Sequence, residues 1–137
     1  MNFLLENYWL IAIALASGAL IAWPALRTRA GGPELSTLAA TQLINRREVQ
    51  IVDVRPVEEF ATGSLASARN VPLADVPGRA GELRKDQPVI VVCEAGRRAS
   101  LAAVKLRSAG IAEVFILSGG LAAWRAAGLP VVRAQKA

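Results

Sequence analysis

Short apolar runs alternate with longer amphipathic segments along most of the chain. The runs at 49–54, 89–92 and 113–117 have the length and the Val- and Ile-rich composition of buried strands. A shorter strand is predicted at 68–71. Helices are predicted at 36–46, 56–60, 80–85, 99–109 and 121–127. Apolar strands that alternate with helices indicate an α/β fold, in which helices cover both faces of a parallel sheet.

Residues at the predicted helix ends support this order. The side chain of Ser36 can accept a backbone N–H at the start of the first helix. Pro56 suits the first turn of the second helix, because the N–H that it lacks would have no helical partner there. Gly128 is expected to end the last helix, and Pro130 prevents its continuation.

The first part of the chain has a different pattern, an uncharged apolar stretch from Asn7 to Leu26. About twenty helical residues rise about 30 Å, the thickness of the hydrocarbon core of a bilayer. Tyr8 near one end and Trp23 near the other match the aromatic residues of membrane interfaces. We therefore expect residues 1–27 to form a single-pass transmembrane anchor.

A cleaved signal peptide is the main alternative for this segment, but Glu6 is the only charged side chain before the apolar stretch and no basic one precedes it. The flanking charges predict the orientation. Arg27 and Arg29 follow the stretch, and the positive-inside tendency then places the C-terminal domain in the cytoplasm. Residues 28–33 are predicted to be a linker, and residues 34–137 the folded domain.

The composition excludes several kinds of chemistry. The chain has no histidine, which excludes Ser-His-Asp and Cys-His catalysis and histidine metal sites. Its single cysteine cannot form an internal disulfide, a Cys-x-x-Cys pair or a multi-thiolate metal site. We expect neither a metal nor a cofactor. The net charge is +5, but no aromatic-studded basic stripe accompanies it, so nucleic-acid binding is not expected.

The single cysteine, Cys93, lies between the strand at 89–92 and the helix that follows. Backbone N–H groups at a helix start have no partner within the helix and can bind an anion. With Arg97 and Arg98 nearby, this setting favours a thiolate and makes Cys93 a candidate nucleophile. The competing interpretation is a buried cysteine that packs as a small apolar side chain. Asp53 also follows a strand, and ligands of parallel sheets bind beyond the carboxyl ends of the strands.

Four segments, in order and at matching spacing, resemble the rhodanese family of sulfurtransferases over about residues 34–132. The segments are VDVRPVEEF (52–60), GSLASARNVP (63–72), CEAGRRAS (93–100) and GGLAAW (119–124). The resemblance implies a rhodanese-like fold, with a central parallel sheet of about five strands and helices on both faces. One departure is visible at Ser64, where the family usually has histidine in a segment that is mostly structural.

The resemblance also implies sulfur transfer. Cys93 would take the outer sulfur of an anionic donor such as thiosulfate, hold it as a persulfide, and pass it to a thiol or protein-cysteine acceptor. The substrate-binding loop would consist of Glu94, Ala95, Gly96, Arg97, Arg98 and Ala99. Its backbone N–H groups can stabilise the thiolate and the persulfide. Arg97 is favoured slightly over Arg98 for substrate contact, and Asp53 and Arg55 are expected to support the loop.

Two alternative functions remain open. One is a membrane-tethered persulfide relay, or a protein-binding rhodanese module with little turnover of free substrates. The other, less favoured, is a phosphatase or arsenate reductase of related fold. A phosphatase loop needs five residues between its cysteine and an arginine, so that the loop can surround a phosphoryl group. In this chain that position is Ala99, and Arg98 comes one residue early.

Overall fold

The computed structural model describes residues 2–30 and 32–133 and, of residues 25–30, only the backbone. The chain divides into two compact units, Met1–Ala30 and Gly31–Ala137. The predicted linker includes Gly31, and the predicted domain ends with residues 134–137; these positions lie outside the described residues.

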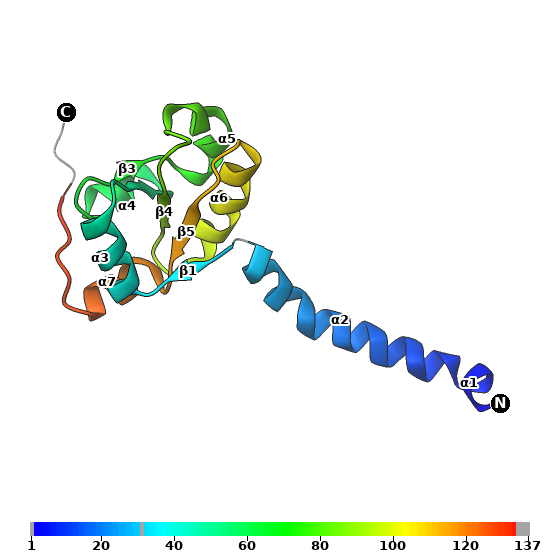
Figure 1. The fold of residues 1–137 in the computed structure, drawn as a ribbon. Coiled ribbons are helices and arrows are strands. Elements are labelled where there is room, and N and C mark those ends of the chain that lie inside the picture. The colour runs from blue at the N-terminus through cyan, green and yellow to red at the C-terminus, as the bar shows by residue number, and fades with distance from the viewer. Residues whose placement is uncertain (1, 31, 134–137) are drawn as a thin grey trace. The chain divides into compact units, whose positions relative to one another are not determined.

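The second unit contains the predicted parallel sheet, which has five strands (Figure 1). The strands are β1 (Glu34–Leu35), β2 (Gln50–Asp53), β3 (Arg69–Asn70), β4 (Val89–Val92) and β5 (Val114–Leu117). Their order across the sheet is β1-β5-β4-β2-β3, and all four pairings are parallel. Strand β4 is therefore central. Its last residue, Val92, pairs with Asp53 at the end of β2.

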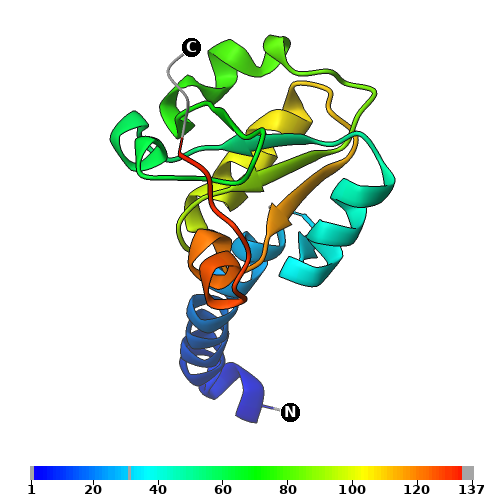
Figure 2. The same ribbon diagram turned by 90° about the vertical axis from the view of Figure 1, so that its left-hand side faces the viewer.

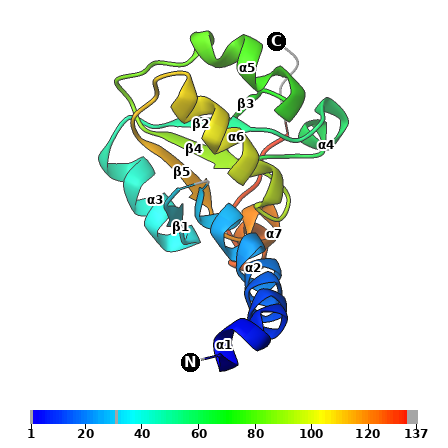
Figure 3. The same ribbon diagram turned by 90° about the vertical axis from the view of Figure 1, so that its right-hand side faces the viewer.

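Helices cover both faces of this sheet, as predicted. The helical segments are α3 (Thr37–Arg46), α4 (Val57–Ala61), η1 (Leu73–Asp75), α5 (Val76–Arg79), η2 (Ala80–Glu82), α6 (Arg97–Ser108) and α7 (Gly120–Ala126). Alternate residues of β4 point to opposite faces. Val89 and Val91 pack with α6, which crosses in front of the strands in Figure 3. Ile90 and Val92 pack on the other face with residues of α3 and α7 (Figure 2).

Most predicted elements form within a few residues of their expected positions, and Ser36 caps α3 by accepting the N–H of Ala39 at 3.1 Å. The helix predicted at 80–85 forms only in part, because η2 covers 80–82 and residues 83–85 are not helical, while the helical turns η1 and α5 precede it at 73–79. Pro77 lies in the first turn of α5, where its missing N–H costs no helical hydrogen bond. The two-residue strand β1 was also missed.

The first unit consists of α1 (Phe3–Glu6) and α2 (Tyr8–Ala30). The expected transmembrane anchor from Asn7 to Leu26 is not supported. Among the described residues, no helix has the length and apolarity that crossing a bilayer requires. The location of the domain in the cell stays a prediction.

Candidate active site

Cys93 follows the last residue of β4, and its side chain continues the alternation of that strand. It belongs to the same buried cluster as Val89 and Val91, on the face that α6 covers. The chain then turns through Gly96, whose φ of +94° lies in the left-handed region that glycine adopts readily. Helix α6 begins at the next residue. The strand alternation and the glycine turn together place the sulfur at the start of α6.

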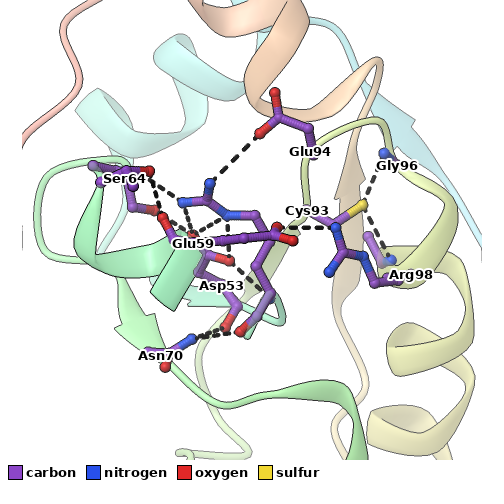
Figure 4. Close-up of polar contacts among 12 residues, drawn as sticks. Asp53, Glu59, Ser64, Asn70, Cys93, Glu94, Gly96 and Arg98 are labelled. Atoms are coloured by element: carbon purple, nitrogen blue, oxygen red, sulfur yellow. Dashed lines mark hydrogen bonds and ion pairs between the residues drawn. The ribbon is translucent and has the colours of Figure 1, made fainter. Parts of the chain in front are cut away.

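Two backbone N–H groups point at the sulfur of Cys93 (Figure 4). Gly96 donates its N–H to Sγ at 2.8 Å, and Ala99 donates its N–H at 3.4 Å. The residue is only 1% exposed. Both interpretations of the sequence therefore describe part of the site, because the cysteine is buried in the core and its sulfur is also hydrogen-bonded by the loop. We call this pair of amides the sulfur cradle.

A second polar group lies at the end of β2. Asp53 is fully buried, and its carboxylate accepts hydrogen bonds from the backbone N–H, Nε and Nη2 of Arg55 at 2.8–3.0 Å. Arg55 is 1% exposed, and its Nη2 also donates to the carbonyl of Gly63 at 2.6 Å. Because Asp53 pairs with Val92, strand alternation puts its carboxylate on the opposite face from the Cys93 side chain. The structure thus does not bring this carboxylate to the sulfur.

Two further residues of this polar group were missed as site residues. Ser64 is buried and donates its hydroxyl to Asp53 Oδ2 at 2.7 Å. Asn70 donates its side-chain N–H groups to the carbonyls of Asp53 and Arg55 at 3.1 and 2.9 Å. The departure from the family pattern at Ser64 was a usable signal, since a small polar residue at a buried position needs a partner. Nothing in the sequence pattern indicated the role of Asn70.

Three ion pairs lie at the rim beside the Cys93 loop. Glu94 lies between two arginines, with Oε1 at 2.9 Å from Arg125 Nη1 and Oε2 at 3.5 Å from Arg55 Nη1. Arg98 is paired with Glu59 at 3.1 Å. All three pairs join residues far apart in sequence, so none of them was predictable from spacing.

The structure places the remaining predicted loop residues at the surface. Ala95 and Arg97 are exposed, and no ion pair involves Arg97 within residues 2–30 and 32–133. The assignment of Arg97 rather than Arg98 to substrate contact stays a prediction.

The rim side chains line an open hollow of about 470 Å³ next to the loop. Its charged lining consists of Arg55, Arg98, Arg125, Glu58, Glu59 and Glu94. Each of the three arginines lies within ion-pair distance of a carboxylate. In the described part of the chain, no three Asp, Glu, Cys or His side chains come close enough together to hold a metal ion. The chemistry available here is that of one sulfur held by amides beside a charge-balanced hollow.

The folded domain resembles known proteins in both sequence and fold. Residues 36–127, about two thirds of the chain, match the rhodanese-like domain family. The chain belongs to the rhodanese family. Solved rhodanese domains have the same architecture: the rhodanese-like domain of the Anabaena protein Alr3790 superposes with a TM-score of 0.69 at 30% identity, covering 74% of this chain and 80% of that one.

Curated rhodanese relatives carry different names. The chain is 40% identical over 78 residues to the uncharacterized protein YqhL of Bacillus subtilis. This alignment covers 57% of this chain and 62% of YqhL. It is 35% identical over 91 residues to a sulfurtransferase of Allochromatium vinosum, covering 66% of this chain and 85% of that protein. The match to YqhL thus leaves more than a third of that relative unmatched.

Proposed function

We propose that this rhodanese domain is a sulfurtransferase that carries sulfur as a persulfide on Cys93. The observation that carries the proposal is the sulfur cradle, in which the N–H groups of Gly96 and Ala99 bond to Sγ. Hydrogen bonds from backbone amides stabilise a thiolate, which is the nucleophilic form of cysteine, and they can stabilise the anionic outer sulfur of a persulfide as well.

With thiosulfate as donor, the first step moves one sulfur atom. The Cys93 thiolate forms a bond to the outer sulfur of thiosulfate, the S–S bond of thiosulfate breaks, and sulfite leaves with the bonding electron pair. The enzyme then holds Cys93–S–S⁻. In the second step an acceptor thiolate attacks this outer sulfur, which forms the acceptor persulfide and restores the Cys93 thiolate. No histidine base is needed, because neither step removes a proton from the nucleophile once it is ionised.

The loop sequence argues against phosphoryl transfer. Residue 99 is an alanine, and its contribution to the loop is a backbone N–H that bonds to the sulfur. Arg98 is engaged with Glu59 at 3.1 Å. A phosphatase loop of this kind needs its arginine at position 99, after five intervening residues, to bind the phosphoryl oxygens, and Arg98 comes one residue early. The amide cradle therefore suits a single sulfur atom better than a phosphate.

Mass spectrometry of the full chain tests the proposal. After incubation with thiosulfate and removal of excess donor, the wild-type protein is expected to gain about 32 Da, the mass of one sulfur atom held as a persulfide. Cys93→Ser should gain nothing, and a later addition of a small thiol should return the wild-type mass to its starting value. A wild-type chain that gains no sulfur from thiosulfate or from a small-thiol persulfide contradicts the proposal.

A relay with little turnover of free thiosulfate is the second candidate, and the hollow supports it. Its three arginines are already paired with carboxylates, so a small dianion would have to displace a carboxylate in order to bind there. The two donors separate the candidates. Loading from a persulfide at least tenfold faster than from thiosulfate, at equal concentration, favours the relay, whereas equal rates favour a thiosulfate enzyme.

A further inference from the structure

The first turn of α7 contacts the backbone of the Cys93 loop directly. The N–H of Leu121 donates to the carbonyl oxygen of Cys93 at 2.9 Å, and the N–H of Ala122 donates to that of Glu94 at 3.0 Å. Both donors come from the start of a helix, where the N–H groups have no partner within the helix. The backbone of the nucleophile and of the next residue is therefore bonded to α7, while the sulfur is bonded to the other end of the loop.

This close approach depends on the absence of a side chain at Gly120. A Cβ built on Gly120 would lie 2.6 Å from the carbonyl oxygen of Glu94 and closer still to that of Cys93. Contacts that short are not tolerated between a methyl group and a carbonyl oxygen, so the loop or the helix would have to move. Gly120 also has a φ of +61°, which side-chain-bearing residues rarely adopt.

The loop, rather than α7, is the part that would give way. Leu121 is fully buried in the core, and Trp124 is buried and donates its Nε1–H to the carbonyl of Pro130 at 2.9 Å. Glu94, by contrast, is only half-buried and Ala95 is exposed. Displacing α7 would disturb the packing of two large buried side chains, whereas displacing the Cys93–Glu94 peptide would move one small buried side chain and one half-buried side chain.

We propose that Gly120 is a positioning residue for sulfur transfer: its lack of a side chain lets α7 hold the Cys93–Glu94 peptide where the sulfur cradle forms. The link to sulfur transfer rests on the proposed function. The role of Gly120 in placing Sγ against the two amides is independent of that function. Arg125 of α7 adds a side-chain contact to the Cys93 loop, because it forms an ion pair with Glu94.

The test is Gly120→Ala, with the two glycines that flank α7, Gly119 and Gly128, as controls. Gly119 has a φ of +72°, and a Cβ there would lie 2.6 Å from the Cβ of Ala123 in α7, away from the Cys93 loop. Gly128 has a φ of +74°, and a Cβ there would meet nothing within 4 Å. All three substitutions impose a similar backbone strain, but only the one at Gly120 crowds the Cys93 loop.

Two readouts distinguish positioning from a merely structural effect. The amide resonances of Gly96 and Ala99 should shift when Cys93→Ser is introduced into the wild-type chain, since their hydrogen-bond acceptor changes. In Gly120→Ala this shift should largely disappear, and persulfide loading should fall about tenfold or more, the effect of losing a hydrogen bond to a charged group. Gly119→Ala and Gly128→Ala should stay within about threefold of wild type. Equal losses in all three variants, or none in Gly120→Ala, overturn the proposal.

Hydrogen exchange of the wild-type chain gives a second test that does not depend on the folding of a variant. Alkylation of Cys93 adds atoms to a buried sulfur and must displace the loop. We expect the Leu121 and Ala122 amides to exchange at least tenfold faster after alkylation, with the Trp124 amide unchanged. Unchanged exchange at both residues overturns the proposal. A wild-type chain that takes up no sulfur would refute the proposed function, yet this exchange experiment would still decide the role of α7.

Discussion

The polar groups at the ends of the neighbouring strands β2 and β4 are held by different kinds of hydrogen-bond donor. At the end of β2, side chains supply most of the hydrogen bonds: the Asp53 carboxylate is bonded by Arg55 and Ser64, and all three residues are almost fully buried. At the end of β4, the backbone supplies the hydrogen bonds, since the Cys93 sulfur accepts them from the N–H groups of Gly96 and Ala99. Strand alternation puts the two groups on opposite faces of the sheet.

This difference predicts which substitutions each polar group tolerates least. A network of buried side chains loses a partner when any one member is truncated, and a charge left unpaired in the core costs stability. An amide cradle has no side chain to truncate, so it is sensitive to changes in backbone conformation instead. Substitutions near Asp53 should therefore reduce stability first, and substitutions in the Cys93 loop should reduce sulfur transfer first.

The largest effect is expected for Arg55→Ala. It leaves the buried Asp53 carboxylate without its cationic partner, and breaking a buried ion pair from one side typically costs about 3–5 kcal/mol. Urea unfolding of the full chain measures the loss in the free energy of unfolding. Because small domains are stable by only about 5–15 kcal/mol, this variant should be visibly destabilised at room temperature.

The double variant Asp53→Asn/Arg55→Ala provides the control. It removes the stranded charge, so it should be less destabilised than Arg55→Ala alone. With Asp53→Asn measured as well, the double-mutant cycle gives the coupling energy between the two residues. Ser64→Ala removes one hydrogen bond to the same carboxylate and should cost about 1–3 kcal/mol. A loss below about 1 kcal/mol for Arg55→Ala would show that the β2 end does not depend on its side-chain network.

The contrast also explains which parts of the site the sequence could predict. Strand runs such as 89–92 and the glycine three residues after Cys93 are local signals, and they correctly located Cys93 between a strand and a helix. The partners of Asp53 other than Arg55 lie many residues away. Ser64 reaches it only because β2 and the segment after α4 are folded together, and Glu59 reaches Arg98 across 39 residues.

Local signals also misled at two places. Pro77 lies in the first turn of α5, whereas the helix was expected only from residue 80, because a proline can equally end or start a helix. The sequence prediction began the last helix at residue 121 and gave no role in the site to Gly120. Its close approach to the Cys93 loop joins segments 27 residues apart, and no local pattern encodes such a contact.

A smaller effect on stability but a larger one on function is expected for Gly96→Ala. An alanine at a φ of +94° costs about 1–2 kcal/mol, and it turns the residue 96 N–H away from Sγ as the backbone relaxes. We expect persulfide loading to fall about tenfold or more, as for the loss of a hydrogen bond to a charged acceptor. Loading is followed by mass spectrometry and stability by urea unfolding.

Gly110→Ala is the matched control for this variant. Gly110 has a φ of +101° and follows the end of α6, where a Cβ would meet only the flexible Lys85 side chain at 3.3 Å. It should lose similar stability and keep its rate of persulfide loading. If both glycine variants lose the same fraction of loading activity, the sulfur cradle has no special role and the comparison between the two strand ends is wrong.

The smallest effect is expected at an exposed ion pair of the same chemistry. Arg47 Nη1 lies 2.7 Å from Glu113 Oε2, as close as Arg55 lies to Asp53, but both side chains are about half exposed. The hydrogen bond from Arg47 holds the pKa of Glu113 below its usual value of 4.5. Because the folded pKa is lowered, the stabilisation is present above that usual value and is lost as the pH falls through the folded pKa.

Arg47→Ala should therefore lower the urea midpoint slightly at about pH 7 and leave it unchanged at about pH 2. Added salt should shrink even the neutral-pH effect, because solvent-exposed charges are screened. A loss as large as that of Arg55→Ala would mean that ion-pair geometry, rather than burial, makes the end of β2 sensitive to substitution.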